Sequence, residues 1–239
     1  MPEEIARHTP PSGSLDFGRS LAFVFEDPDW VRKILVGALF GLLSFLAIGG
    51  FFIGGYVLRV LRRSAQGEAA PLPEWDDLGG MLVDGLRSTC IYLGYIVPLI
   101  GIPILVALSL GLAGILTGRA ESTGDAQELL LGLIILAAYG FFFLVSLALM
   151  IYLPAAFTRF AVSNRFAAAF EVQENLAFIQ RNGANYALAL VVYLLASVIA
   201  QFGIVLCCLG LLPTTFWATL VLGYALGEVA RRDPAGLPR

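Results

Sequence analysis

The residues with the clearest capacity for chemistry are two groups of acidic side chains, at 26–29 and 74–84, each beside a tryptophan. Carboxylate oxygens at this density could bind a hard cation or a partner. The same residues also suit helix N-termini, where carboxylates accept backbone N–H groups, and tryptophans that anchor a chain at a membrane surface. We expect helix capping and membrane anchoring to be the main roles of these residues. A contact site for lipid or a partner protein is the second reading, and its candidates are Trp30, Glu74, Trp75, Asp76 and Asp77.

Sequence patterns typical of an enzyme are missing. The chain has no Gly-rich phosphate loop, zinc-protease helix motif or nucleophile elbow, and its one histidine is His8, near the N-terminus. Cys90, Cys207 and Cys208 lack the spacing of a metal or redox motif and lie in apolar segments, where a thiol packs as a small apolar group. We therefore predict that the protein is not an enzyme and holds no cofactor or metal.

The composition exceeds what a soluble domain of 239 residues can bury, with 58% hydrophobic residues, 14% charged residues and a mean hydropathy of +0.82. The charges are also segregated from the apolar residues. A membrane span needs ~20 apolar residues, and four longer runs contain no Asp, Glu, His, Lys or Arg. These runs are 34–58, 88–118, 129–158 and 182–227. The sequence therefore predicts an all-α integral membrane protein with the lipid bilayer as its surroundings.

The number of spans follows from the rule that cytoplasmic segments carry the excess of Lys and Arg. Clusters of Arg and Lys flank the first run and follow the third and fourth, whereas the loop after the second run is acidic. If all four basic segments are cytoplasmic, the run 34–58 enters and returns as a hairpin, broken at Ile48-Gly49-Gly50, and the last run divides at 208–213. We expect about six transmembrane helices in three hairpins with both termini cytoplasmic. The alternative has five spans, with 34–58 crossing once.

Each expected hairpin follows a segment whose apolar residues recur at helical spacing, at 17–25, 78–86 and 166–179. Such segments are typical of amphipathic helices that lie in the cytoplasmic interface, and their recurrence suggests a threefold internal repeat. The dipeptide Asp27-Pro28 suits an N-cap followed by proline at the first helical position. Outside a single membrane domain at 15–232, the polar tails at 1–14 and 233–239 are predicted to be disordered.

Five stretches of the sequence resemble a known family. They lie at 16–30, 55–62, 71–79, 154–161 and 168–171. Together they are similar to a prokaryotic membrane-protein family known only as domain of unknown function 4013. The resemblance implies a multi-pass protein of a prokaryotic plasma membrane in which Trp30 and Trp75 have a structural or functional role. It implies no activity and no catalytic residue.

The functional hypothesis is a membrane organiser or partner-binding component that acts through its cytoplasmic interfacial helices. The alternative is a transporter or channel-like protein for a small or amphipathic solute, with Pro98, Pro103 and Gln201 along its path, because prolines free helix carbonyls and Gln201 is polar at mid-span. The net charge of −3, without a basic face, argues against nucleic acid as a partner. A membrane-protein partner fits the first hypothesis.

Cysteine labelling with a membrane-impermeant reagent tests the six-span topology. Cysteines placed at Ser64 and Ser163 should react only from the cytoplasmic side, and one at Glu121 only from outside, because the basic segments stay inside. Labelling of the cysteine at 64 or 163 from the outside would contradict the six-span topology.

Overall fold

The computed structural model describes residues 13–46, 48–69, 72–116, 125–206, 210–233 and 235, and within 102–131 it describes only some of the side chains. Over these residues every regular element is a helix, as the sequence predicts. The elements in chain order are α1 (Phe17–Ala22), η2 (Phe23–Glu26), α2 (Trp30–Leu43), η3 (Ser44–Leu46), α3 (Gly49–Gln66), α4 (Leu78–Leu116), α5 (Asp125–Ser163), η5 (Phe166–Phe170), α6 (Val172–Arg181), α7 (Gly183–Gln201), η6 (Phe202–Leu206) and α8 (Leu211–Arg231).

The helices form two compact units. The core unit comprises residues 1–89 and 154–239, and the hairpin unit comprises 90–153. Both long helices, α4 and α5, contribute to both units, since α4 begins and α5 ends in the core unit.

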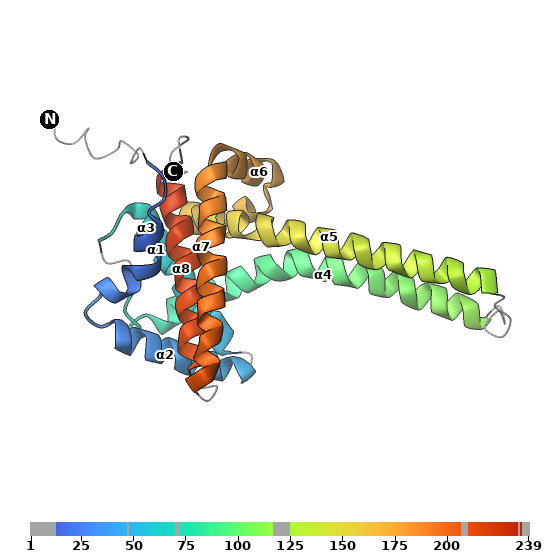
Figure 1. Ribbon diagram of the computed structural model, residues 1–239, viewed down its shortest axis with the longest axis horizontal. Coiled ribbons are helices and arrows are strands. Elements are labelled where there is room, and N and C mark those ends of the chain that lie inside the picture. Colours follow the sequence, from blue (N-terminus) through green and yellow to red (C-terminus); the bar gives the residue numbers. More distant parts are fainter. Residues whose placement is uncertain are drawn as a thin grey trace. The chain divides into compact units, whose positions relative to one another are not determined.

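In the core unit, α8 lies between α3 and α7 and contacts both (Figure 1). α3 and α8 run in the same direction at close range, because a Cβ at Gly223 would lie 3.1 Å from the Val57 carbonyl oxygen and one at Gly227 would lie 2.5 Å from that of Leu61. α7 runs antiparallel to α8, and Thr214 near the start of α8 donates to the Ala200 carbonyl near the end of α7 at 2.8 Å. Glycine is therefore what lets α3 approach α8 closely.

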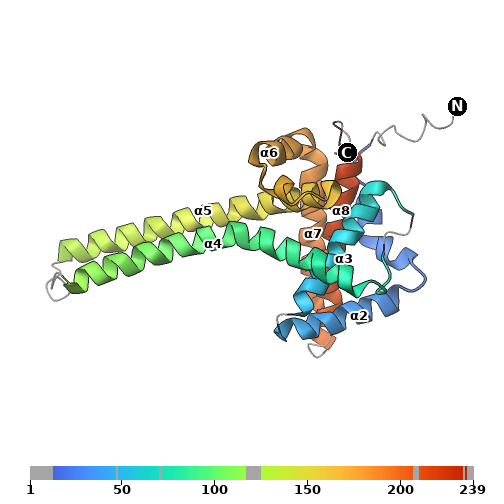
Figure 2. The same ribbon diagram turned by 180° about the vertical axis from the view of Figure 1, so that it is seen from behind.

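α2 crosses α8 instead of running alongside it. Figures 1 and 2 both show α2 lying across the direction of α7 and α8. Gly37 faces the Phe216 ring, where an added Cβ would lie 2.1 Å from a ring carbon, and Gly41 faces Leu212. The opposite side of α2 is apolar and exposed, including Leu35 and Leu39.

The centre of the core unit is apolar and includes side chains from six helical segments: η2, α2, α3, α4, α7 and α8. Tyr56, Val60 and Met81 are almost completely buried there, and Phe23 stacks on Tyr224 with ring centroids 4.2 Å apart. This packing fixes α1 and η2 against the bundle. The amphipathic segment predicted at 17–25 is thus helical and places Phe23 and Val24 inward.

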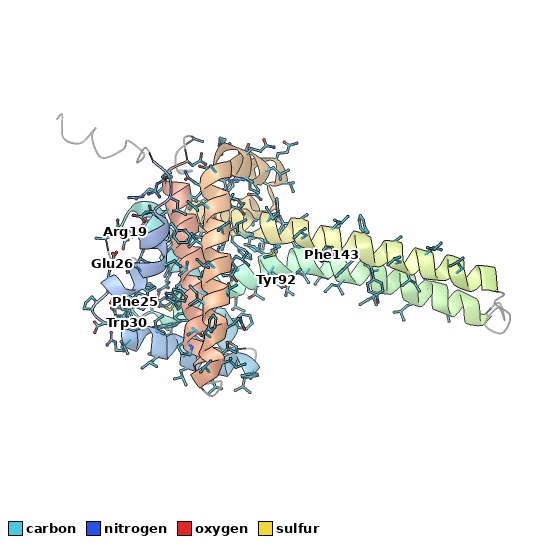
Figure 3. All side chains as sticks on the ribbon, in the orientation of Figure 1. Arg19, Phe25, Glu26, Trp30, Tyr92 and Phe143 are labelled. Carbon is cyan, nitrogen blue, oxygen red and sulfur yellow. The ribbon has the colours of Figure 1, made fainter. Side chains whose placement is uncertain are left out.

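The hairpin unit pairs the C-terminal part of α4 with the N-terminal part of α5 (Figures 1 and 2). The hydroxyls of Tyr95 and Tyr152 lie 3.1 Å apart across the pair, with their rings edge to face. Most described apolar side chains of this unit point outward, for example Phe143, which is labelled in Figure 3 and is 66% exposed. Three helices in the described part of the chain are long and apolar enough to cross a membrane, over Leu78–Leu105, Gly132–Ser163 and Gly183–Val205.

Several local predictions can be compared with the structure. The break at Ile48-Gly49-Gly50 is confirmed, since η3 ends at Leu46 and α3 begins at Gly49. A break within the last run is also confirmed, because α8 begins at Leu211 with Pro213 in its first turn, while 207–209 lie outside the described residues. The segment 78–86 is helical but is the beginning of α4, with no boundary before the apolar run. The predicted tails fall mostly outside the described residues; Asp233, which is described, is buried.

Burial changes the choice of residues for topology labelling. Ser64 is buried and donates to the Tyr224 carbonyl at 2.9 Å, so a cysteine there would be shielded by the protein itself. Glu68, just beyond the end of α3, is exposed and replaces it. Ser163 is half-buried at the end of α5, and Glu121 lies outside the described residues.

Substituting Gly85 with alanine should destabilise the core unit. Its Cβ would lie 1.7 Å from the Phe51 carbonyl oxygen, so α3 and α4 must move apart, at a cost of about 1–3 kcal/mol. The thermal midpoint measured by circular dichroism in detergent should fall. Gly79→Ala is the control, because nothing lies within 4 Å of a Cβ there. Equal midpoints for the two variants would contradict the close crossing of α3 and α4.

Candidate functional site

A buried ion-pair cluster lies at the start of α2, where the first group of acidic residues meets the second. The Lys33 ammonium lies 2.8 Å from an Asp27 carboxylate oxygen and 2.7 Å from one of Glu74. It also donates to the Leu72 carbonyl at 3.3 Å. The side chains of Lys33 and Asp27 are only 5% and 7% exposed. The cluster therefore ties α2 to the segment 72–77 that leads into α4.

Local hydrogen bonds explain why α2 begins where it does. One Asp27 oxygen accepts the Asp29 N–H at 2.9 Å, and the other accepts from Lys33. The Trp30 N–H donates to the Asp27 carbonyl as part of a turn. The helix consequently begins at Trp30, two residues later than Asp27-Pro28 predicts, although Asp27 does cap a backbone N–H.

Lys33 keeps its charge in this setting. Burial favours the neutral amine, but the hydrogen bonds and charges of Asp27 and Glu74 outweigh it and raise the pKa of Lys33 above its usual value. The stabilisation from this pair is present below the ordinary lysine pKa of ~10.4 and is lost only as the pH rises through the raised value. The cluster is thus a permanent ion pair at neutral pH.

Trp75 belongs to the packing of the core unit. Its ring stacks on those of Tyr56 and Phe40, with centroids 4.3 and 4.9 Å away, and its Nε1–H donates to the Lys33 carbonyl at 3.1 Å. The Tyr56 hydroxyl donates to the Pro73 carbonyl at 2.9 Å. These contacts hold the segment 72–77 against α2 and α3, which accounts for a tryptophan at this position.

Of the remaining predicted contact residues, Asp76 has few contacts with the fold, and Trp30 packs one side against the hydrophobic core. Trp30 is half-buried, edge-on to the exposed Phe25 at 5.0 Å, and Figure 3 shows the two labelled side chains together. Asp76 is exposed, and among the described residues its carboxylate accepts a hydrogen bond only from the neighbouring Asp77 N–H. By contrast, Glu74 is paired with Arg32 at 2.6 Å as well as with Lys33.

Asp77 caps α4, as carboxylates before a helix are expected to do. It accepts the Gly80 N–H at 2.9 Å and pairs with Arg59 at 2.5 Å. The Gly80 N–H first, and then Arg59, lower the pKa of Asp77. Its contribution to stability is therefore present above the usual aspartate pKa and is lost as the pH falls through the lowered value.

A second set of ion pairs connects the ends of several helices of the core unit. Arg62 on α3 pairs with Asp84 on α4 at 2.7 Å and donates to the Ala161 carbonyl on α5 at 2.9 Å. Glu171 accepts from both Arg159 and Arg165. Further pairs join Arg181 to Asp233 and Glu228 to Arg231 and Arg232. From the sequence, these arginines were used only to predict topology, and their ionic partners were not predicted. The acidic residues just outside the apolar runs are the signal that could have identified those partners.

A small cavity of about 130 Å³ lies beside the Glu228 pairs, between α1 and α8. Its charged lining is mixed: Arg19 and Arg232 face it together with Asp16 and Glu228. Asp16 caps α1 by accepting the Arg19 N–H, and Glu228 is already paired. The cavity therefore offers no excess of one charge to a ligand.

The residues of the predicted solute path belong to different units. Pro98 and Pro103 lie in the hairpin unit, where α4 continues as a helix through both. Gln201 is exposed at the C-terminal end of α7 in the core unit. A path lined by all three stays a prediction. Among the described residues, no group of three or more His, Cys, Asp and Glu side chains could hold a metal ion.

A family model described as "Protein of unknown function (DUF4013)" matches residues 39–209, well over half of the chain. The chain belongs to the DUF4013 family. The match includes the cluster residue Glu74, the capping Asp77 and most of the helices of both units, whereas α1, most of α2 and all of α8 lie outside it. No curated protein and no solved structure matches the chain. Membership in DUF4013 agrees with the resemblance noted in the sequence.

Removing the buried ammonium should strongly destabilise this DUF4013 protein. Lys33→Met leaves two carboxylates facing one another without their cation, which we expect to cost about 3–5 kcal/mol. Arg32→Met is the matched control, because that side chain is 66% exposed and an exposed pair contributes only about 0–1 kcal/mol. Thermal unfolding in detergent measures both. A similar small loss for the two variants would show that the Lys33 cluster does not hold α2 in place.

Proposed function

We propose that this chain is a multi-pass protein of a prokaryotic plasma membrane that acts as a non-enzymatic organiser, contacting lipid or a partner membrane protein through the polar end of its core unit. The observation that carries the proposal is the outward-facing apolar surface of the hairpin unit. The polar end is the α2 N-terminus together with the segment 72–77, which the Lys33 ion pairs join.

The surface of the hairpin unit supports the membrane location. Leu136 is 68% exposed and Tyr139 is 71% exposed, although both lie within the candidate span Gly132–Ser163. Large contiguous apolar patches are rare on soluble monomers, whereas in hydrocarbon they cost nothing. Polar groups inside a bilayer bond across helices, as the hydroxyls of Tyr95 and Tyr152 do.

The ion pairs support a topology in which the basic segments share one side. Arg62 contacts α4 and α5, and Ser64 near the end of α3 bonds to Tyr224 near the end of α8. Arg181, just before α7, pairs with Asp233 just after α8. The ends that the positive-inside rule assigns to the cytoplasm are therefore neighbours in the core unit. This agrees with three hairpins, α2–α3, α4–α5 and α7–α8, and both termini inside.

The length and direction of α2 favour a returning hairpin over a single crossing of the first apolar run. α2 has 14 residues, fewer than the ~20 of a full span, and it lies across α7 and α8 (Figure 1). Lys33 at its start and Arg63 near the end of α3 both donate to the Leu72 carbonyl. The two ends of the α2–α3 hairpin consequently lie together at the polar end.

The polar end offers a partner two side chains that the fold does not use fully. Trp30 presents a half-buried ring beside the exposed Phe25, and Asp76 presents an exposed carboxylate. Tryptophan is common among the few residues that supply most of the binding energy of a protein interface. Trp75 and Asp77, by contrast, already have roles in packing and capping.

Native mass spectrometry tests this proposal, using nanodiscs formed directly from the membranes of the cells that make the protein. We expect a bound lipid or protein to be retained, and the bound fraction to fall about tenfold or more in Trp30→Ala and Asp76→Asn. Asp76→Asn keeps the oxygen that accepts the Asp77 N–H, so the fold should persist. Glu174→Gln, an exposed acid elsewhere in the core unit, is the control. A bare monomer, or equal retention in all variants, would contradict the organiser function.

A further inference from the structure

The helix between the last two long apolar stretches, α6, turns Asn175 and Phe178 inward and leaves apolar residues exposed. α6 buries Asn175 completely, while Val172 and Leu176 are 51% and 44% exposed. The Asn175 amide donates to the Ala169 carbonyl at 2.8 Å and accepts from Arg159 at 3.2 Å. A surface helix of a soluble protein turns its apolar stripe toward the core. In α6 the buried face holds this hydrogen-bonded amide together with the Phe178 ring, while Val172 and Leu176 face outward.

The surface of α6 is divided into three arcs. Val172, Leu176 and Ile179 follow one another at spacings of four and three residues, so they form one apolar stripe. Glu174 and Arg181 lie on the far side of the helix from that stripe, since each residue turns the helix by ~100°. The third arc, with Asn175, faces the core unit. A helix at a phospholipid surface needs this division among protein, apolar phase and water.

The turn before α6 extends the same apolar surface and adds charge. Phe166 and Phe170 of η5 are 45% and 39% exposed. Arg165, beside them, is 62% exposed and shares the carboxylate of Glu171 with Arg159. Two guanidinium groups with one carboxylate leave a positive charge at this turn, which suits the phosphates of lipid headgroups.

We propose that the η5–α6 surface, defined by Phe166, Phe170, Val172 and Leu176, lies in the boundary between headgroups and acyl chains of a phospholipid leaflet, with Arg165 directed to the lipid phosphates. The inference rests on the proposed membrane location. Its specific support is continuity, because the candidate span in α5 ends at Ser163 and the next begins at Gly183. Both ends of the connecting segment are therefore held at the membrane boundary, and amphipathic helices there sink ~5–10 Å into it.

Nitroxide accessibility tests the depth of α6 in a bilayer. The full chain, with its three native cysteines replaced by alanine, is reconstituted alone into phospholipid nanodiscs at one copy per disc. Nitroxides are attached to Leu176→Cys, to its matched control Glu174→Cys, and to Phe143→Cys in the hairpin unit, all exposed positions. Collision rates with oxygen, which concentrates in lipid, and with a nickel chelate, which stays in water, are compared. We expect the oxygen-to-nickel ratio to be several-fold higher at 176 than at 174.

The three labels separate failure of this inference from failure of the proposed function. A low ratio at both 176 and 174, with a high ratio at 143, would overturn the α6 inference and leave the membrane location standing. A low ratio at 143 as well would overturn the membrane location, and the inference with it. A label at 176 shielded from both reagents would mean that protein covers the stripe, which would also overturn lipid as its occupant.

Discussion

The exclusion of charge from the long apolar segments is the constraint on which the rest of the structure depends. Charged side chains are costly in a low-dielectric surrounding unless they are paired, so those that remain collect where helices end. In the core unit they pair with one another: Lys33 with Asp27 and Glu74, and Arg62 with Asp84. The pairs join helices that are far apart in the sequence. One physical requirement thus both segregates the charges along the chain and connects the helix ends in space.

Close contact between helices is a second feature that holds the core unit together. α8 approaches α3 at Gly223 and Gly227, and α2 approaches α8 at Gly37, where a side chain would overlap the neighbouring helix. The α3–α8 contacts place glycine backbone against backbone, and Gly37 places it against the Phe216 ring, so that close packing gains dispersion energy. They explain how a unit whose outer faces are apolar can still hold α8 and α3 in one arrangement.

The residues that look most like a functional site in the sequence serve the fold to different degrees. Trp75 stacks between the rings of Phe40 and Tyr56, and Asp77 caps α4. Asp76 keeps its carboxylate, and Trp30 part of its ring, available to a partner. An acidic motif beside a tryptophan therefore contains mostly residues that cap or pack helices, and a few exposed side chains. The proposed organiser would use these exposed side chains.

The sequence by itself determined the helical class, the apolar runs and the positions of the helix breaks, because these depend on local properties: hydropathy, charge and residues that begin helices, such as Pro213. It also indicated carboxylates at helix starts, as Asp77 confirms. It could not say which ionic partners meet, since Lys33 and Glu74 are joined only by the path of the whole chain. Nor could it orient α6, because periodicity locates an apolar stripe without saying what covers it. Only the tertiary structure decided that Asn175 faces the core and Leu176 faces outward: the hydrogen bonds that satisfy a buried amide come from residues brought there by folding.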